Sequence, residues 1–161
     1  MSDTLDILEN ITYNELNEGD SATFTRTLTE DELVLFAAVS GDVNPVHLDS
    51  EFAADTLFKE RIAHGMWSGS LISAALATVM PGPGTIYLDQ TLSFKRPVKL
   101  DDTLTVKLTV SEKGAKNRVT LACDVRNQNG DQVVVGEAKV IAPTEKVSLQ
   151  KPRLPKITIE G

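Results

Sequence analysis

The segment from Gly65 to Met80 constrains the fold most, because it contains no charged residue. In a helix of about four turns its apolar side chains would point to nearly every side. They are Met66, Trp67, Leu71, Ile72, Ala74, Ala75, Leu76, Ala77, Val79 and Met80. Such a helix must be covered by other structure. The run Pro81-Gly82-Pro83-Gly84 follows and ends it abruptly. We therefore predict a buried helix over 65–80.

Segments of alternating apolar and polar residues follow this helix and predict strands. They lie near 86–95, 104–110, 119–125 and 132–141, and 21–28 is a fifth candidate. Strands joined by short turns pair antiparallel, with one face packed and the other in water. The apolar helix is the partner that the packed face needs. The predicted fold class is therefore α+β, a curved antiparallel sheet wrapped around one long central helix.

Shorter helical segments precede the apolar helix. The segment Thr29 to Glu32 has the form of a capping box, in which the side chain of each of these two residues bonds the backbone N–H of the other. An apolar stripe runs from Leu33 to Val39, and Ser40-Gly41 ends this helix. A polar loop over 42–50 and a short helical piece over 51–58 follow.

The charge balance excludes several classes of partner. The chain has 16 Lys and Arg residues against 23 Asp and Glu, which gives a net charge of -7. Since no basic cluster stands out, we expect neither a nucleic acid partner nor binding to an anionic membrane surface. No apolar run approaches the ~18 residues of a membrane span. The single cysteine, Cys123, and an acidic N-terminus unlike a signal peptide predict a cytoplasmic protein.

The length of 161 residues fits one domain with short ends. We expect the domain over residues 10–143, an N-terminal extension over 1–9, and a C-terminal tail or linker over 144–161. Pro152, Pro155 and many charged residues set the tail apart.

The polar loop is a candidate catalytic site. Asp42 and His47 lie five residues apart, and Pro45 stiffens the turn between them. This spacing can direct a carboxylate and an imidazole at one small volume, where they could share a water molecule. Spacing alone favours a purely structural interpretation, in which Asp42 and Asn44 form Asx turns and His47 is an ordinary loop histidine.

A second candidate lies at the start of the apolar helix. The Gly65 N–H would be an unpaired donor at a helix N-terminus, which favours an oxyanion, although the glycine could simply allow a tight helix entry.

A two-histidine, one-carboxylate iron site is also conceivable, formed by His47, His64 and one of Asp42 or Asp49. Their spacing is not specific for one, so we expect no metal and no cofactor.

Several of these motifs together resemble one enzyme family. The run from Phe36 to His47, followed after five residues by Ala53, resembles the signature of the (R)-specific enoyl-CoA hydratases, also called hydratase 2 or MaoC-like dehydratases. His64-Gly65-Met66 and the run Phe94 to Val98 are also similar to this family. The resemblance extends from about Asn10 to Val140. It implies the hot-dog fold and a homodimer, which would cover an exposed sheet edge.

The resemblance also implies roles for single residues. Asp42 would act as general base on a water that adds to C3 of a trans-2-enoyl-CoA, giving the (3R)-3-hydroxyacyl-CoA. His47 would orient the water and donate the proton that ends on C2, and Asn44 would support the loop. The Gly65 N–H would bind the thioester carbonyl. Ser73 matches an assisting position, although a helical serine can equally bond a backbone carbonyl.

Two other functions stay open. A thioesterase of the same fold would use the same helix start but attack C1 and release a thiol. A non-catalytic module that binds acyl thioesters would keep the shape without the chemistry. Lys95 and Arg96 could meet the phosphates of CoA, or be solvated charges.

Overall fold

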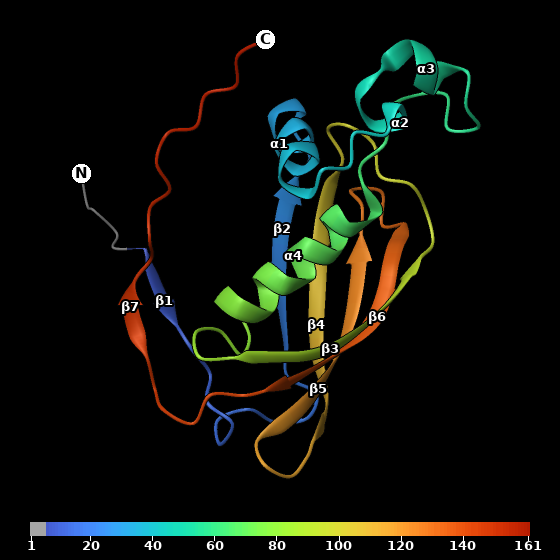
Figure 1. The fold of residues 1–161 in the computed structure, drawn as a ribbon. Helices are drawn as coiled ribbons and strands as arrows, with labels where there is room; N and C mark the ends of the chain where they lie inside the picture. The colour runs from blue at the N-terminus through green and yellow to red at the C-terminus, as the bar shows by residue number, and fades with distance from the viewer. Residues whose placement is uncertain (1–5) are drawn as a thin grey trace.

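The computed structural model describes residues 6–161, in which an antiparallel sheet curves around one long helix (Figure 1). The sheet is built from β2 (Ser21–Thr27), β3 (Ile86–Phe94), β4 (Thr103–Lys113), β5 (Arg118–Arg126) and β6 (Gln132–Ile141). The helices are α1 (Glu30–Ser40), α2 (Pro45–Leu48), α3 (Ser50–Ala54) and α4 (Gly65–Thr78). Short strands β1 (Ile7–Glu9) and β7 (Ser148–Gln150) form a separate ribbon. The predicted α+β class and the strand at 21–28 are confirmed.

The five strands follow the order β2-β4-β5-β6-β3, and every neighbouring pair is antiparallel. The register shifts between Tyr87 and Asp89 in β3 and between Val110 and Glu112 in β4. Such bulges bend a strand and increase its twist, which helps the sheet to wrap around the helix. The predicted curved sheet around a central helix, the hot-dog arrangement, is thus confirmed.

The core lies between the inner face of the sheet and one side of α4. Alternate residues of β4 and β5 are buried, as the period-two pattern predicts. From α4 the core receives Trp67, Leu71, Ile72, Ala75 and Leu76. The sheet therefore holds the start of α4 in one place, beside the loop that follows α1 (Figure 1).

The expectation that α4 is covered on all sides is wrong for the single chain. Its side with Met66, Ser70, Ser73 and Ala77 is exposed, and the Met66 side chain is 57% exposed. The packed face expected for β3 is only partly present, since Leu92 packs against the core but Ile86 and Phe94 are 56% and 53% exposed. β3 is an edge strand, and no strand among residues 6–161 pairs with its outer edge.

Two helix predictions also need correction. The Thr29 hydroxyl caps α1 by accepting from the Glu32 N–H at 3.2 Å, but the Glu32 carboxylate pairs with Arg26 at 2.5 Å instead of completing the box. The helical piece expected over 51–58 is the shorter α3, which ends at Ala54.

The terminal segments lie side by side. Antiparallel pairing of β1 with β7 joins the predicted N-terminal extension to the predicted tail, while residues 1–5 of that extension lie outside the described residues. Beyond β7 the chain is extended and exposed. Over residues 6–161, no helix combines the length and apolar character needed to cross a membrane.

Candidate active site

The loop predicted between α1 and α3 contains the short helix α2. Asn44 is its N-cap and accepts from the Val46 N–H at 3.1 Å, while Pro45 occupies the first turn. The Asn44 N–H in turn donates to Asp42 Oδ1 at 3.1 Å. Asp42 and Asn44 therefore do form the Asx turns of the structural interpretation. The other carboxylate oxygen, Asp42 Oδ2, takes no part in this turn and points toward His47.

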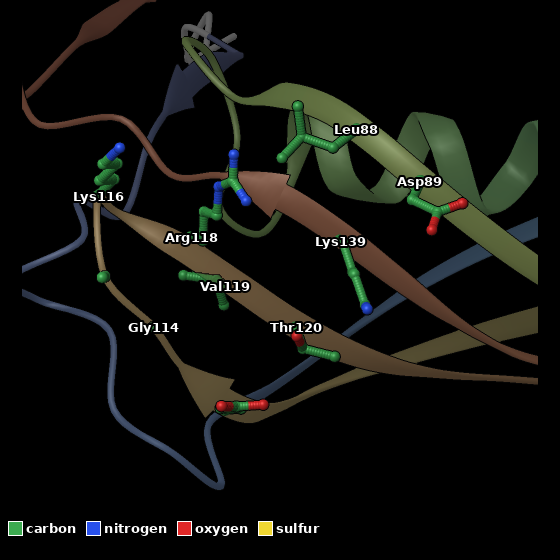
Figure 2. Close-up of a pocket in the computed structure, with 10 residues that line it drawn as sticks. Leu88, Asp89, Gly114, Lys116, Arg118, Val119, Thr120 and Lys139 are labelled. Atoms are coloured by element: carbon green, nitrogen blue, oxygen red, sulfur yellow. The ribbon is translucent and has the colours of Figure 1, made fainter.

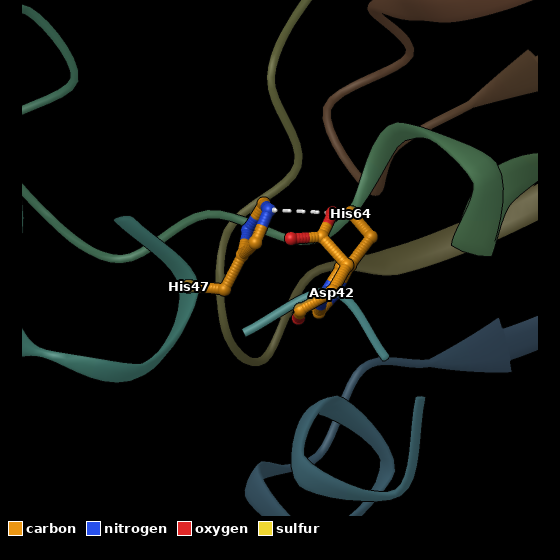
Figure 3. Close-up of side chains that lie close together, drawn as sticks. All are labelled: Asp42, His47 and His64. Carbon is orange, nitrogen blue, oxygen red and sulfur yellow. Dashed lines mark hydrogen bonds and ion pairs between the residues drawn. The ribbon is translucent and has the colours of Figure 1, made fainter. Parts of the chain in front are cut away.

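The His47 ring is fixed at one nitrogen and open at the other. Its Nδ1–H donates to the Ile62 carbonyl at 2.7 Å, because a carbonyl oxygen can only accept. Arg61 holds the same turn, donating from Nε to the His47 carbonyl at 2.6 Å and pairing with Glu30 at 2.9 Å. His47 Nε2 then lies 3.7 Å from Asp42 Oδ2 (Figure 3). The imidazole is 9% exposed and the carboxylate 49%, so a ligand can reach the pair from the Asp42 side.

His64 joins the pair to the start of α4. Its Nε2–H donates to the Asp42 carbonyl at 2.9 Å. Its ring stacks on that of His47, with centroids 3.8 Å apart and planes at 24°, and contacts Phe36 at 5.0 Å. His64 Nδ1 is buried and has no hydrogen-bond partner among the described residues. Sequence reasoning used His64 only as part of a motif and in the iron hypothesis. Its position next to Gly65 was the one signal that placed it near the site.

Gly65 begins α4 directly after His64, as predicted. The first N–H groups of a helix have no intrahelical acceptor, and the macrodipole makes this end electropositive. A cavity of about 270 Å³ lies beside it. Its lining includes Gly65, Phe94, Lys95 and Arg96, so two cations stand at the same cavity as the free helix end.

Ser73 is not brought to the Asp42–His47 pair. It lies eight residues beyond Gly65 on the exposed side of α4, in a groove of about 500 Å³ that Phe36 and Tyr87 also line. Within the described part of the chain its hydroxyl makes no hydrogen bond to the backbone, unlike that of Ser70, which donates to the Trp67 carbonyl at 2.6 Å. Burial, with a smaller effect of Cys123, raises the pKa of Tyr87 to about 12, so this groove presents a neutral phenol.

Asp42, His47 and His64 could also approach a metal ion, since one ligand atom from each lies within 4.8 Å of the others. Nearly parallel stacked rings, however, direct their in-plane lone pairs side by side, whereas ligands of one ion must converge on it. His64 Nε2 is moreover engaged by the Asp42 carbonyl. The donor set therefore fits a water or substrate better than a metal.

A hollow of about 710 Å³ lies elsewhere, where β3, β5, β6 and the β4–β5 turn meet (Figure 2). Lys116, Arg118 and Lys139 line it together with Asp89 and Glu112. It includes none of the candidate catalytic residues, which lie in the loop before α2, on α2 and at the start of α4.

Comparison with known proteins shows the family of the chain. A family model described as "MaoC like domain" matches residues 14–132, which includes every candidate site residue. The chain belongs to the MaoC-like family. The matched part runs from before β2 to Gln132, the first residue of β6, so it covers all four helices and the strands β2, β3, β4 and β5.

Individual members of the MaoC-like family are similar to this chain in sequence and in structure. The (R)-specific enoyl-CoA hydratase of Rhodospirillum rubrum is 41% identical over 131 residues, 81% of this chain and 91% of the relative. The R-hydratase PhaJ1 of Pseudomonas aeruginosa is 61% identical over 96% of this chain and 100% of that one, with a TM-score of 0.94. The R-hydratase of Aeromonas caviae is 42% identical over 80% of this chain and 98% of that one, with a TM-score of 0.77.

Proposed function

We propose that this chain is an (R)-specific enoyl-CoA hydratase, a hydro-lyase that adds water reversibly to a trans-2-enoyl-CoA and gives the (3R)-3-hydroxyacyl-CoA. The observation that carries the proposal is the 3.7 Å separation of Asp42 Oδ2 and His47 Nε2 beside the start of α4. This separation is too long for a direct hydrogen bond. A water about 2.8 Å from each atom would fit between them. The names of the similar proteins support the same reaction.

The hydrogen bonds support a proposal for which atoms transfer the protons. Asp42 Oδ2 accepts a proton from the water as its oxygen forms the bond to C3. Because His47 Nδ1–H is held by the Ile62 carbonyl, the proton for C2 comes from Nε2 of the imidazolium. After the reaction Asp42 is protonated and His47 Nε2 is not. Transfer of this proton from Asp42 to His47 Nε2 restores the carboxylate and the imidazolium. Hydrogen and hydroxyl have been added, and no redox cofactor takes part.

The start of α4 supplies the second requirement. C3 becomes electrophilic only when the conjugated thioester carbonyl is polarised. In the proposal the Gly65 N–H donates to this carbonyl as negative charge develops on its oxygen, aided by the helix dipole. An acid–base pair contributes ~10²–10⁴ in rate, and an oxyanion donor ~10²–10³. Asn44 supports the loop through its cap on α2, and Lys95 and Arg96 stand where the phosphates of CoA could approach.

A homodimer is part of the proposal. The edge strand β3 and the exposed side of α4 leave one continuous uncovered surface, which includes Met66, Ile86 and Phe94. A second copy that pairs along β3 would cover both. Replacing Ile86 and Leu88 by lysine should convert the dimer to a monomer in sedimentation velocity, because charged side chains would then stand in the apolar surface that the second copy covers. An unchanged sedimentation coefficient would contradict pairing through this edge.

One assay separates the hydratase from its alternatives. Hydration of crotonyl-CoA removes the enoyl absorbance and releases no thiol, whereas a thioesterase releases free CoA at the rate at which substrate is lost. A binding module would bind the thioester and leave both signals unchanged. We expect loss of absorbance without thiol and formation of the (3R) product, which chiral chromatography identifies.

We also propose that residues 10–143 form the catalytic domain and that the enzyme works in the cytoplasm, a reducing compartment that suits the unpaired Cys123.

A further inference from the structure

His64 contacts both members of the proposed acid–base pair through different groups. Its Nε2–H reaches the backbone of Asp42, and its ring face lies on the ring of His47. We infer that His64 is a positioning residue, which holds Asp42 and His47 at the separation the reaction requires. The inference rests on the proposed function, because it concerns how that site is assembled.

The hydrogen bond fixes the backbone from which the general base projects. Asp42 lies just after the end of α1, and no helix or strand includes it. Its N–H is held by the Ser40 hydroxyl at 3.2 Å and its carbonyl by His64 Nε2–H at 2.9 Å. With both peptide groups held, the Asx turn to Asn44 directs Oδ1 inward and leaves Oδ2 toward His47. The bond also ties the Asp42 backbone to the residue that precedes Gly65, so acid–base pair and helix start move together.

The stack fixes the plane of the general acid. A hydrogen bond from Nδ1 to Ile62 sets the tautomer of His47 but allows the ring to rock about that bond. The His64 ring lies 3.8 Å below it, and Phe36 packs against His64 in turn, at 5.0 Å. These rings keep His47 Nε2 directed at Asp42. A misplacement of about 1 Å at such a pair can lower the rate ~100-fold.

The unpaired nitrogen of His64 argues that packing alone does not explain this residue. Nδ1 is buried without a partner among residues 6–161, and such an atom is unfavourable in a protein interior. A phenylalanine has a ring of nearly the same size, could stack in the same place and would bury no unpaired acceptor. The one thing that a phenylalanine cannot provide is the donor to the Asp42 carbonyl. The structure therefore assigns the imidazole to the site and not to the stability of the fold.

The test compares His64→Phe, which keeps a ring, with His64→Gln, whose amide N–H can reach the same carbonyl. For His64→Phe we expect kcat for crotonyl-CoA hydration to fall about 10- to 100-fold. KM should stay within about threefold of wild type, since the Gly65 N–H, Lys95 and Arg96 that would hold the substrate are unchanged. We expect the thermal midpoint to stay close to that of wild type, because removal of the buried unpaired nitrogen offsets the lost hydrogen bond to the Asp42 carbonyl. His64→Gln should recover part of the lost kcat.

Thr78→Ala is the matched control, since it also removes a side-chain bond to a backbone carbonyl, at the far end of the same helix. It should leave kcat unchanged. The inference is overturned if His64→Phe keeps kcat within about threefold of wild type. It is equally overturned if kcat falls only together with the thermal midpoint, or if His64→Gln is no better than His64→Phe. A wild-type protein that does not hydrate crotonyl-CoA contradicts the proposed function instead, before any variant is compared.

Discussion

The ring of Phe94 packs so closely against Gly65 that it leaves little room for a side chain at this position. A Cβ built on Gly65 would be 3.1 Å from Phe94 Cε1, closer than an ordinary van der Waals contact. Phe94 ends β3, and Gly65 starts α4, so this contact sets how closely the helix start approaches the edge of the sheet. This contact explains why a residue without a side chain stands at position 65. Backbone strain does not explain it, because Gly65 begins a regular helix.

Gly65→Ala should therefore lower hydration through crowding. The new methyl group must displace the Phe94 ring or the start of α4, and we expect kcat to fall about tenfold. In a Phe94→Leu background the same change should cost less, because the narrower side chain leaves room. Steady-state rates of the two single variants and the double variant measure this coupling. Losses that simply multiply would contradict the contact.

Asp42→Asn and His47→Gln should each remove most of the activity. Both changes keep the shape of the side chain but remove the base or the acid, so we expect rates ~10²–10⁴-fold lower. Asp131→Asn, on the turn between β5 and β6, provides a control that also loses one carboxylate. Circular dichroism of each variant should match wild type. Activity within about tenfold of wild type in both site variants would remove these two residues from the mechanism.

Asn44 should matter through its helix cap. Asn44→Ala removes the acceptor for the Val46 N–H, and loss of such a cap lowers the free energy of unfolding by about 1 kcal/mol. Because α2 carries His47, we also expect a lower kcat. Asn44→Ser, which retains a capping oxygen, should keep most of both. Urea denaturation and crotonyl-CoA hydration measure the two effects, and equal behaviour of alanine and serine would contradict the capping role.

The two histidines should be opposite neutral tautomers. His47 donates from Nδ1 to Ile62, whereas His64 donates from Nε2 to Asp42. The chain contains only these two histidines, so long-range ¹H–¹⁵N correlation spectra of the untagged protein give only two imidazole patterns. Above the pH at which either ring is charged, we expect one Nδ1–H and one Nε2–H pattern. Two identical patterns would show that one of these bonds is absent.

Cys123 should be unreactive in the folded protein. Burial raises the pKa of its thiol, so at a pH of about 8.5, where an ordinary cysteine is half ionised, the neutral form persists. The side chain is also 1% exposed. Iodoacetamide should label it only after denaturation, as intact mass measures. Rapid labelling of the native protein would show that β5 opens readily at this position.

Much of the fold follows from local patterns in the sequence. The alternation in β4 and β5 and the charge-free run of α4 both correspond to elements of the predicted type. β3 shows the same alternation, yet its side chains are mostly exposed, because alternation tells which residues share a face and not whether anything covers that face. The short α2 within a predicted loop depends on the Asn44 cap and Pro45, signals that a search for longer helices passes over.

The sequence by itself determined the strands, the apolar helix and the two residues, Asp42 and His47, whose spacing lets one stiff turn bring them together. Only the tertiary structure decided that His64 lies beneath His47, that Phe94 closes on Gly65, and that Ser73 faces a separate groove. The physical reason is range. Periodicity and capping depend on residues within a few positions of one another. His64 and His47 are instead 17 positions apart, and Phe94 and Gly65 are 29 apart, so their approach is set by how α4 packs on the curved sheet.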